Sequence, residues 1–311
     1  NLPTVYGNIQ FAISHDNIDG GPSTVEHFDN GSTLGVLHDH MLAPGVTGFF
    51  RLEIDRLFAN DITSFEEDDD RFRVEHGYIG VRGENFGQIW LGTDDSAYET
   101  AVAEISEFFE VGTLSLAPSF DTGESDLIQY RSPVFNGLSL AGSVQFNGDS
   151  SIKKSYPWQL AALYEVNNLE LAFAVDSNDG GTAFNSRNDP SLNNENTYGF
   201  RASYTLDNLR LTGEYHTRKD VSDTFGVMGI YTLGANQFAL AYEQQKDDFG
   251  AENKRDTITL QALHNLSDNL YVYVEGYLGG GDDVYEYTDG TGATAASDER
   301  SIASVGATYY F

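Results

Sequence analysis

The feature that most constrains this chain is a recurring segment of about ten residues in which apolar and polar side chains alternate. In "LSLAGSVQF" (138–146), Leu, Leu, Val and Phe fall at even positions, and Ser, Ala, Ser and Gln fall between them. A two-residue period is the signature of a β-strand with two different faces. About ten residues is also the length that lets a tilted strand cross a lipid bilayer.

Sixteen segments of this kind follow one another along the chain. We place them at 4–14, 31–42, 46–58, 72–82, 86–93, 125–132, 138–146, 157–166, 169–176, 197–206, 209–217, 223–232, 237–245, 256–265, 270–278 and 300–311. Short connections such as 43–45, 167–168 and 207–208 alternate with long acidic ones at 15–30, 59–71, 94–124, 177–196 and 279–299. This asymmetry is typical of outer-membrane barrels, with short periplasmic turns and long external loops. The sequence therefore predicts an all-β fold, a 16-stranded antiparallel transmembrane β-barrel in which residues 1–311 form a single domain.

Two soluble folds are the alternatives. Sandwich strands usually have five or six residues and no strict alternation of long and short connections. A propeller would show a repeat of 40–50 residues, and the sequence has none. An even number of strands would also place both termini on the same rim.

Charge limits the partners. The chain has 48 acidic and 17 basic residues, for a net charge of −31, which argues against nucleic acid as a partner and favours cations. It has no cysteine, so disulfide and thiolate sites are excluded. No apolar run approaches the 18 residues of a transmembrane helix.

The final segment is apolar to its last residue. In "SVGATYYF", Val305, Ala307, Tyr309 and Phe311 alternate with small or polar residues. Chain ends are usually frayed, so this pattern predicts a terminal strand that is held in the sheet. Such a strand would close the barrel against the first one and leave no free edge.

Several motifs resemble the general diffusion porins of Gram-negative outer membranes. They are "VYG" (5–7), "YRSPVFNGLSLAGSVQF" (130–146), "LHNLSDNLYVYVEGY" (263–277) and "VGATYYF" (305–311). The chain departs from the family pattern at His264, where Tyr is usual, and at Asp268-Asn269, which replace a basic pair.

The resemblance implies a homotrimer of water-filled barrels in the outer membrane, in contact with lipid and lipopolysaccharide, that passes small hydrophilic solutes and ions. It also implies that Phe311 and Tyr309 form the signal read by the outer-membrane assembly machinery.

The resemblance further implies that the third long connection, about 94–124, folds into the barrel as a constriction loop. This stretch contains eight carboxylates and no Lys or Arg. Glu104, Glu107 and Glu110 have the i, i+3 spacing that would place them on one face of a helical turn. We predict that these three residues and Asp121 form the acidic side of the constriction. The alternative is a solvated external loop.

The opposite wall is expected to be weakly basic. Strand alternation turns Arg51, Arg131, Arg201 and Arg210 inward. Thr33 and Thr93 stand where the family pattern has arginines. Inward acids, among them Glu53 and Asp55, are in the majority. Rings of carboxylates attract cations, so a cation-preferring pore is predicted.

We expect no catalysis and no cofactor. His38 and His40 share one strand face, but no third metal ligand follows from the spacing. The acidic run 66–70, with Asp68, Asp69 and Asp70, is a candidate Ca²⁺ site in an external loop. The alternative function is a substrate-specific channel, for example for oligosaccharides, with aromatic side chains along the pore. Trp90 is the inward aromatic residue that would suit it.

Overall fold

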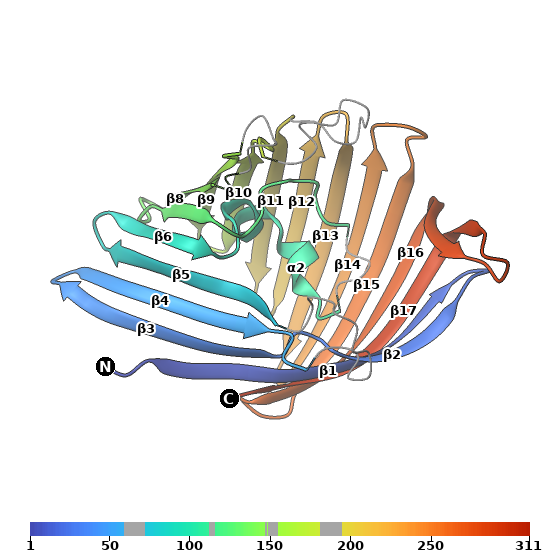
Figure 1. Cartoon of the computed structure of the whole chain (residues 1–311), viewed down its shortest axis with the longest axis horizontal. Helices are drawn as coiled ribbons and strands as arrows, with labels where there is room; N and C mark the ends of the chain where they lie inside the picture. The colour runs from blue at the N-terminus through green and yellow to red at the C-terminus, as the bar shows by residue number, and fades with distance from the viewer. Residues whose placement is uncertain (59–71, 112–115, 147, 149–154, 181–194) are drawn as a thin grey trace.

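The strands of the computed structural model form one closed antiparallel sheet (Figure 1). The structure describes residues 1–311 except 59–71, 112–115, 147, 149–154 and 181–194. The strands are β1 Thr4–Ile18, β2 Ser23–Asp29, β3 Thr33–Ala43, β4 Val46–Asp55, β5 Arg73–Gly83, β6 Gly87–Thr93, β7 Leu127–Arg131, β8 Leu138–Gln145, β9 Trp158–Val166, β10 Leu169–Asp176, β11 Thr197–Leu206, β12 Leu209–Arg218, β13 Ser222–Leu233, β14 Asn236–Asp247, β15 Lys254–Asn265, β16 Leu270–Thr288 and β17 Thr294–Tyr310. Each pairs with its neighbours, and β17 pairs with β1 to complete the circle.

The described residues contain 17 strands, but these occupy the 16 positions that the sequence predicts. Residues 11–17 of β1 pair with β2, and residues 4–8 pair with β3. The strands β2 and β3 are therefore two parts of one broken strand, interrupted at residues 30–32. This confirms the predicted 16-stranded antiparallel barrel.

Two of the expected long loops are largely strand, so that part of the prediction is wrong. The first connection shrinks to residues 19–22, because β1 extends to Ile18 and β2 follows at once. The last shrinks to residues 289–293 between the extended β16 and β17. Outside a bilayer a strand needs no apolar face, so these extensions lack the alternation that marks the other strands.

The short connections and both termini share one rim. β9 and β10 are joined by two residues, as are β11 and β12. Asn167 and Asp207 lead these turns with φ of 52° and 50°, a left-handed conformation that Asn and Asp tolerate better than most residues. At the same rim, the Phe311 backbone N–H donates to the Gly7 carbonyl oxygen over 3.0 Å.

The two faces of the sheet differ as the alternation predicts. In β8, Leu140 is 52% exposed on the outer face, whereas Ser143 on the inner face is 2% exposed. Similar apolar residues project from the outer face of most strands, and the buried inner residues are mainly polar. Among the described residues, no helix is both long enough and apolar enough to cross a membrane.

Candidate functional site

The connection between β6 and β7 folds into the barrel. We call residues 94–126 the inner loop; its described part carries two short helices, α1 Ala97–Val102 and α2 Glu104–Phe108. The first begins at Ser96, whose backbone N–H and hydroxyl both donate to the Glu99 carboxylate. Figure 1 shows α2 within the ring of strands.

The helix α1 is anchored to the wall by Tyr98. Its ring is fully buried, and α1 packs on the small side chains Ala161, Ala172 and Ala174 of β9 and β10. Its hydroxyl lies 2.6 Å from Nδ1 of His216. Small wall residues thus leave room for the helix, and an aromatic residue fixes it there.

Wall carboxylates hold the rest of the inner loop by its backbone. Glu214 accepts a hydrogen bond from the Ile105 N–H at 2.7 Å, and Glu243 accepts one from Leu116 at 2.7 Å. Glu275 accepts two, from the N–H groups of residues 110 and 111 at 2.9 and 2.8 Å. The sequence suggested that inward acids would form a ring of free charge, but these three do not. They satisfy backbone donors of the loop instead.

Asp121 is also an anchor. Its carboxylate forms a bidentate pair with Arg218, at 3.1 and 2.9 Å, and the Arg218 side chain is 1% exposed. A buried guanidinium needs such a partner. Arg218 lies one residue beyond the strand predicted from the sequence, which ended at 217, although its inward alternation with Glu214 and His216 could have revealed it.

A cavity of about 580 Å³ lies between the inner loop and β10–β12. It is lined by Asp95, Glu99, Thr100, Ala103, Glu104, Glu107, Phe108, Glu170, Arg201 and Arg210. Arg210 bridges Glu104, at 2.7 Å, and Glu170, at 2.5 Å. Arg201 donates to the Ala101 carbonyl oxygen at 2.8 Å and lies 3.5 Å from Glu170.

Three carboxylates of this cavity have no Lys or Arg ion-pair partner among the described residues: Asp95, Glu99 and Glu107. Partial loss of hydration beside the inner loop raises the pKa of each, and neighbouring carboxylates raise it further. Burial together with the charges of Glu99, Asp95 and Glu75 raises the pKa of Glu124 to about 8. Acidic groups are therefore crowded on this side of the loop, and the Glu124 carboxyl holds a proton at neutral pH.

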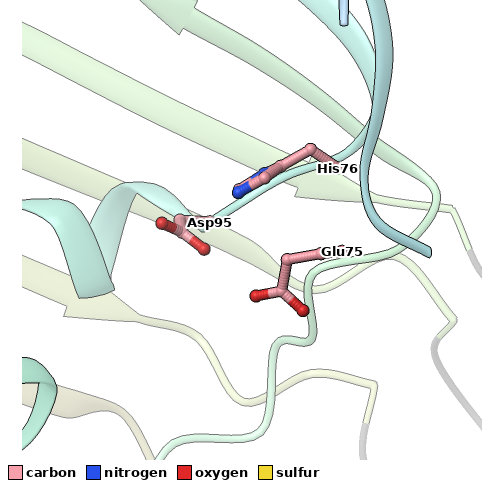
Figure 2. A group of neighbouring side chains, drawn as sticks. All are labelled: Glu75, His76 and Asp95. Atoms are coloured by element: carbon pink, nitrogen blue, oxygen red, sulfur yellow. The ribbon is translucent and has the colours of Figure 1, made fainter. Parts of the chain in front are cut away.

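The acidic group continues onto β5, where Glu75 and His76 lie beside Asp95 of the inner loop (Figure 2). Glu75 is the extra residue of a β-bulge, because Glu53 pairs with His76 and Ile54 with Val74. Adjacent residues can therefore project toward the same space. The possible ligand atoms of this trio lie within 4.8 Å of one another, as do those of Asp95, Glu99 and Glu124. The His76 ring is already engaged, with Nδ1 2.9 Å from Asp94 and Nε2 3.6 Å from Glu53.

The predicted acidic trio does not share one face. Glu104 and Glu107 line the cavity, but α2 ends at Phe108 and Glu110 lies beyond it. The Glu110 carboxylate accepts a hydrogen bond from the Tyr271 hydroxyl on β16 at 2.9 Å. The i, i+3 spacing fails at this point because the helix has only five residues.

The predicted wall residues lie in two regions. Arg201 and Arg210 are at the cavity, whereas Arg51 is on β4, paired with buried Glu53 at 3.0 Å. Asp55 pairs with Arg73 at 2.8 Å. Thr33 accepts a hydrogen bond from Asn8 at 2.8 Å, and Thr93 ends β6 opposite Gly77. Arg131 is the last residue of β7 and is exposed.

The remaining candidates have simpler positions. Tyr309 pairs with Ile9 in the closing strand and is 50% exposed, and Phe311 is bonded to Gly7. The rings of His38 and His40 are stacked, with centroids 6.1 Å apart, on the same face of β3 as the exposed Leu34. Asp68, Asp69 and Asp70 fall outside the described residues, so the Ca²⁺ hypothesis there stays a prediction.

Comparisons with known proteins bear on the family and the fold. A family model described as Gram-negative porin matches residues 3–284. Two curated relatives, a "Monosaccharide porin" of Halomonas sp and the "Major outer membrane protein" of Halomonas elongata, are each 26% identical over 353 aligned residues. Each alignment covers 99% of this chain and 91% of the relative.

Solved structures share the fold. An anion-selective porin from Comamonas acidovorans superposes with a TM-score of 0.75 at 17% identity, covering 100% of this chain and 99% of that one. OmpF of Salmonella typhi in complex with daunomycin gives 0.78 at 16% identity, covering 99% and 97%. OmpT of Vibrio cholerae in its trimer form gives 0.66 at 16% identity, covering 100% and 99%.

Proposed function

This chain belongs to the Gram-negative porin family, whose members are channels of the outer membrane, and on that premise we propose that it passes small hydrophilic solutes by passive diffusion with a preference for cations. The observation that carries the cation preference is the balance of charge at the inner-loop cavity. Five carboxylates line it against two guanidinium groups.

Ion pairing sharpens this balance. Arg201 and Arg210 are engaged with Glu104 and Glu170, so their charges are largely cancelled. Asp95, Glu99 and Glu107 face the same space without a basic partner among the described residues. A cation that passes within about 10 Å of them at 0.1 M salt is attracted, because that is the range of unscreened charge.

The fold by itself does not decide the sign of the selectivity. A structure with the same fold is described as an anion-selective porin. The preference must therefore come from the charged side chains of each chain, and in this one the acids exceed the bases at the constriction.

The test is the reversal potential of the purified channel in a planar bilayer under a KCl gradient. We expect its sign to show preference for K⁺ over Cl⁻ at 0.1 M salt, and its magnitude to shrink toward 1 M, where the screening length falls to about 3 Å. A reversal potential of zero or of the opposite sign would overturn the cation preference while leaving the channel itself established by its conductance.

A second function is a preference for saccharides. It is favoured by the relative described as a monosaccharide porin and by aromatic side chains that gather on the inner wall around Trp90. Diffusion and saccharide binding are compatible, since a weak site in a wide pore slows a solute without excluding others.

The assembled state belongs to the same proposal. We expect a homotrimer, embedded in outer-membrane lipid and lipopolysaccharide, whose assembly depends on Phe311 and Tyr309. A structure with this fold is described as a trimer form. Unheated gel samples should run as an oligomer that heating converts to the monomer, and deletion of Phe311 should lower the amount in the outer membrane. A single monomeric band in unheated, folded samples would contradict the trimer.

A further inference from the structure

The inner wall of β4–β6 carries an aromatic surface that adjoins the acidic group at His76 and Asp94. We call Phe49, Tyr78 and Trp90 the aromatic patch. The rings of Phe49 and Tyr78 meet edge to face, with centroids 6.1 Å apart. Gly80 on β5 lies between the strands of Phe49 and Trp90. It pairs with Phe49 on β4 and with Trp90 on β6.

Gly80 is what allows the rings to approach. A Cβ atom at this position would lie 2.5 Å from the tip of the Phe49 ring and 2.7 Å from the Cβ of Trp90. The ring of Phe49 therefore covers the backbone of the middle strand. An aromatic ring over a strand glycine is a known stabilising arrangement, and it accounts for Phe49. It does not account for Tyr78 and Trp90, which lie beside it.

Polar groups border the patch in the manner of a binding site. Gln88 pairs with both Arg82 and Arg131 across the sheet, beside the short turn between β5 and β6. Among the described residues, the side chains of Gln88 and Arg131 make no hydrogen bond or ion pair, and Arg131 is exposed. Nearer the inner loop, the Trp90 indole N–H donates a hydrogen bond of 2.9 Å to the Asp94 carboxylate. This bond fixes the Trp90 ring at the start of the loop.

The charges beside the patch are mostly paired. Arg82 binds Asp39 and lies 5.1 Å above the Phe49 ring centre, and Arg51 binds Glu53. Paired charges give little net attraction to a free ion. They offer hydrogen-bond donors and acceptors to a neutral solute. Apolar rings with a few placed polar groups are the usual lining of a small-molecule site.

We propose that the aromatic patch is a weak binding subsite for neutral saccharides in pyranose form, whose C–H face stacks on Tyr78 and Trp90 while hydroxyl groups bond to Gln88 and Arg131. The inference rests on the proposed channel function, because a sugar reaches this wall only through the lumen. It deepens the proposed preference for saccharides by naming the ring form of the sugar and the surface that holds it. A pyranose has both a flat apolar face and a polar rim, and so complements the patch better than an ion or an open-chain polyol.

Fluorescence gives a direct test because the chain has only two Trp residues. Replacing Trp158, on the opposite face of β9 from buried Gln159, by Phe leaves Trp90 as the sole Trp. We expect glucose to change the Trp90 emission saturably and to protect it from acrylamide quenching. The acyclic polyol sorbitol at equal concentration should do neither. The W90F variant, which retains Trp158, should not respond to glucose. A response that is linear, or equal for glucose and sorbitol, would overturn the proposal.

Channel recording separates this proposal from the proposed function. Glucose should reduce the K⁺ current in a saturable way, and Tyr78→Leu should raise the concentration for half block by at least about threefold. Each variant is compared with its own open current. The control is Phe225→Leu on the outer face, where Phe225 is 45% exposed; its half-block concentration should match the wild type. A channel that conducts K⁺ but shows no glucose block would remove the subsite alone, whereas absence of any current would remove the channel function.

Discussion

At the scale of single residues, ion pairing decides which acids can act on a passing cation. Glu104 is bound by Arg210, and Glu110 is turned toward Tyr271. Glu107 is exposed at the cavity and has no basic partner among the described residues. A lone charge about 8 Å from the ion path contributes about 0.5 kcal/mol in water, or about a twofold effect on permeability.

The Glu107→Gln substitution should therefore lower the K⁺/Cl⁻ permeability ratio about twofold at 0.1 M salt. The reversal potential in a KCl gradient measures this. Glu110→Gln is the matched control, because it removes the same charge three residues away and should change the ratio much less. Equal effects of the two substitutions would show that Glu107 has no special exposure to the ions.

Glu124 should make the selectivity depend on pH. Its pKa of about 8 means that the folded channel holds a proton there at neutral pH and gains a negative charge above pH 8. The K⁺/Cl⁻ ratio should rise between pH 7 and pH 9, and Glu124→Gln should flatten this rise. The pKa is raised relative to the unfolded chain, so the stability linked to this proton is full at acidic pH and is lost as pH rises through 8. An unchanged pH profile in the variant would place the titrating group elsewhere.

At the scale of elements, the inner loop is held by wall carboxylates and not by its own helices. Glu275 accepts four hydrogen bonds, two from loop N–H groups and one each from Gln261 and Tyr277. Helices of five and six residues have little stability alone. The position of the loop thus depends on the strands around it.

Glu275→Ala should loosen the loop. It leaves two N–H donors unsatisfied, at a cost of about 1–3 kcal/mol each. We expect faster amide hydrogen exchange at residues 105–111 and greater noise in the open-channel current. Glu286→Ala, in the exposed upper part of β16, is the control and should alter neither. Wild-type exchange rates in the Glu275 variant would mean that the other wall contacts fix the loop without Glu275.

The same contrast shows what could be read from the sequence. Each strand carries its own signal in its alternation, so 16 strand positions and the inward or outward direction of residues such as Arg201 and Leu140 were predictable. The inner loop has no such period. Its path follows from contacts with residues more than 100 positions away, such as Ile105 with Glu214 and Glu110 with Glu275. The bulge at Glu75 and the break between β2 and β3 are likewise set by pairing partners and leave no local pattern.

At the scale of the whole molecule, the barrel is closed at one seam. β1 pairs with β17 over residues 8–18. At the rim of the short connections, Gly7 and Phe311 exchange two backbone hydrogen bonds of 3.0 and 3.1 Å. Closure removes the last free edge, which would otherwise expose unpaired backbone groups to lipid. The stability of the barrel should therefore be sensitive to this seam.

Gly7 and Gly213 provide a matched test of the seam. Both are strand glycines flanked by inward-facing residues. A Cβ at Gly7 would lie 2.5 Å from the Thr33 carbonyl oxygen and 2.6 Å from the Phe311 ring, whereas a Cβ at Gly213 would meet nothing within 4 Å. Overpacking of this kind typically costs about 1–3 kcal/mol. Gly7→Ala should lower the temperature at which the detergent-solubilised barrel unfolds. The shift of the gel band from the folded to the unfolded position measures this temperature. Gly213→Ala should leave that temperature unchanged or raise it, since Ala loses less conformational entropy than Gly on folding. If the two variants unfold together, Phe311 can move aside without loss, and closure does not depend on the contact between the ends of the chain.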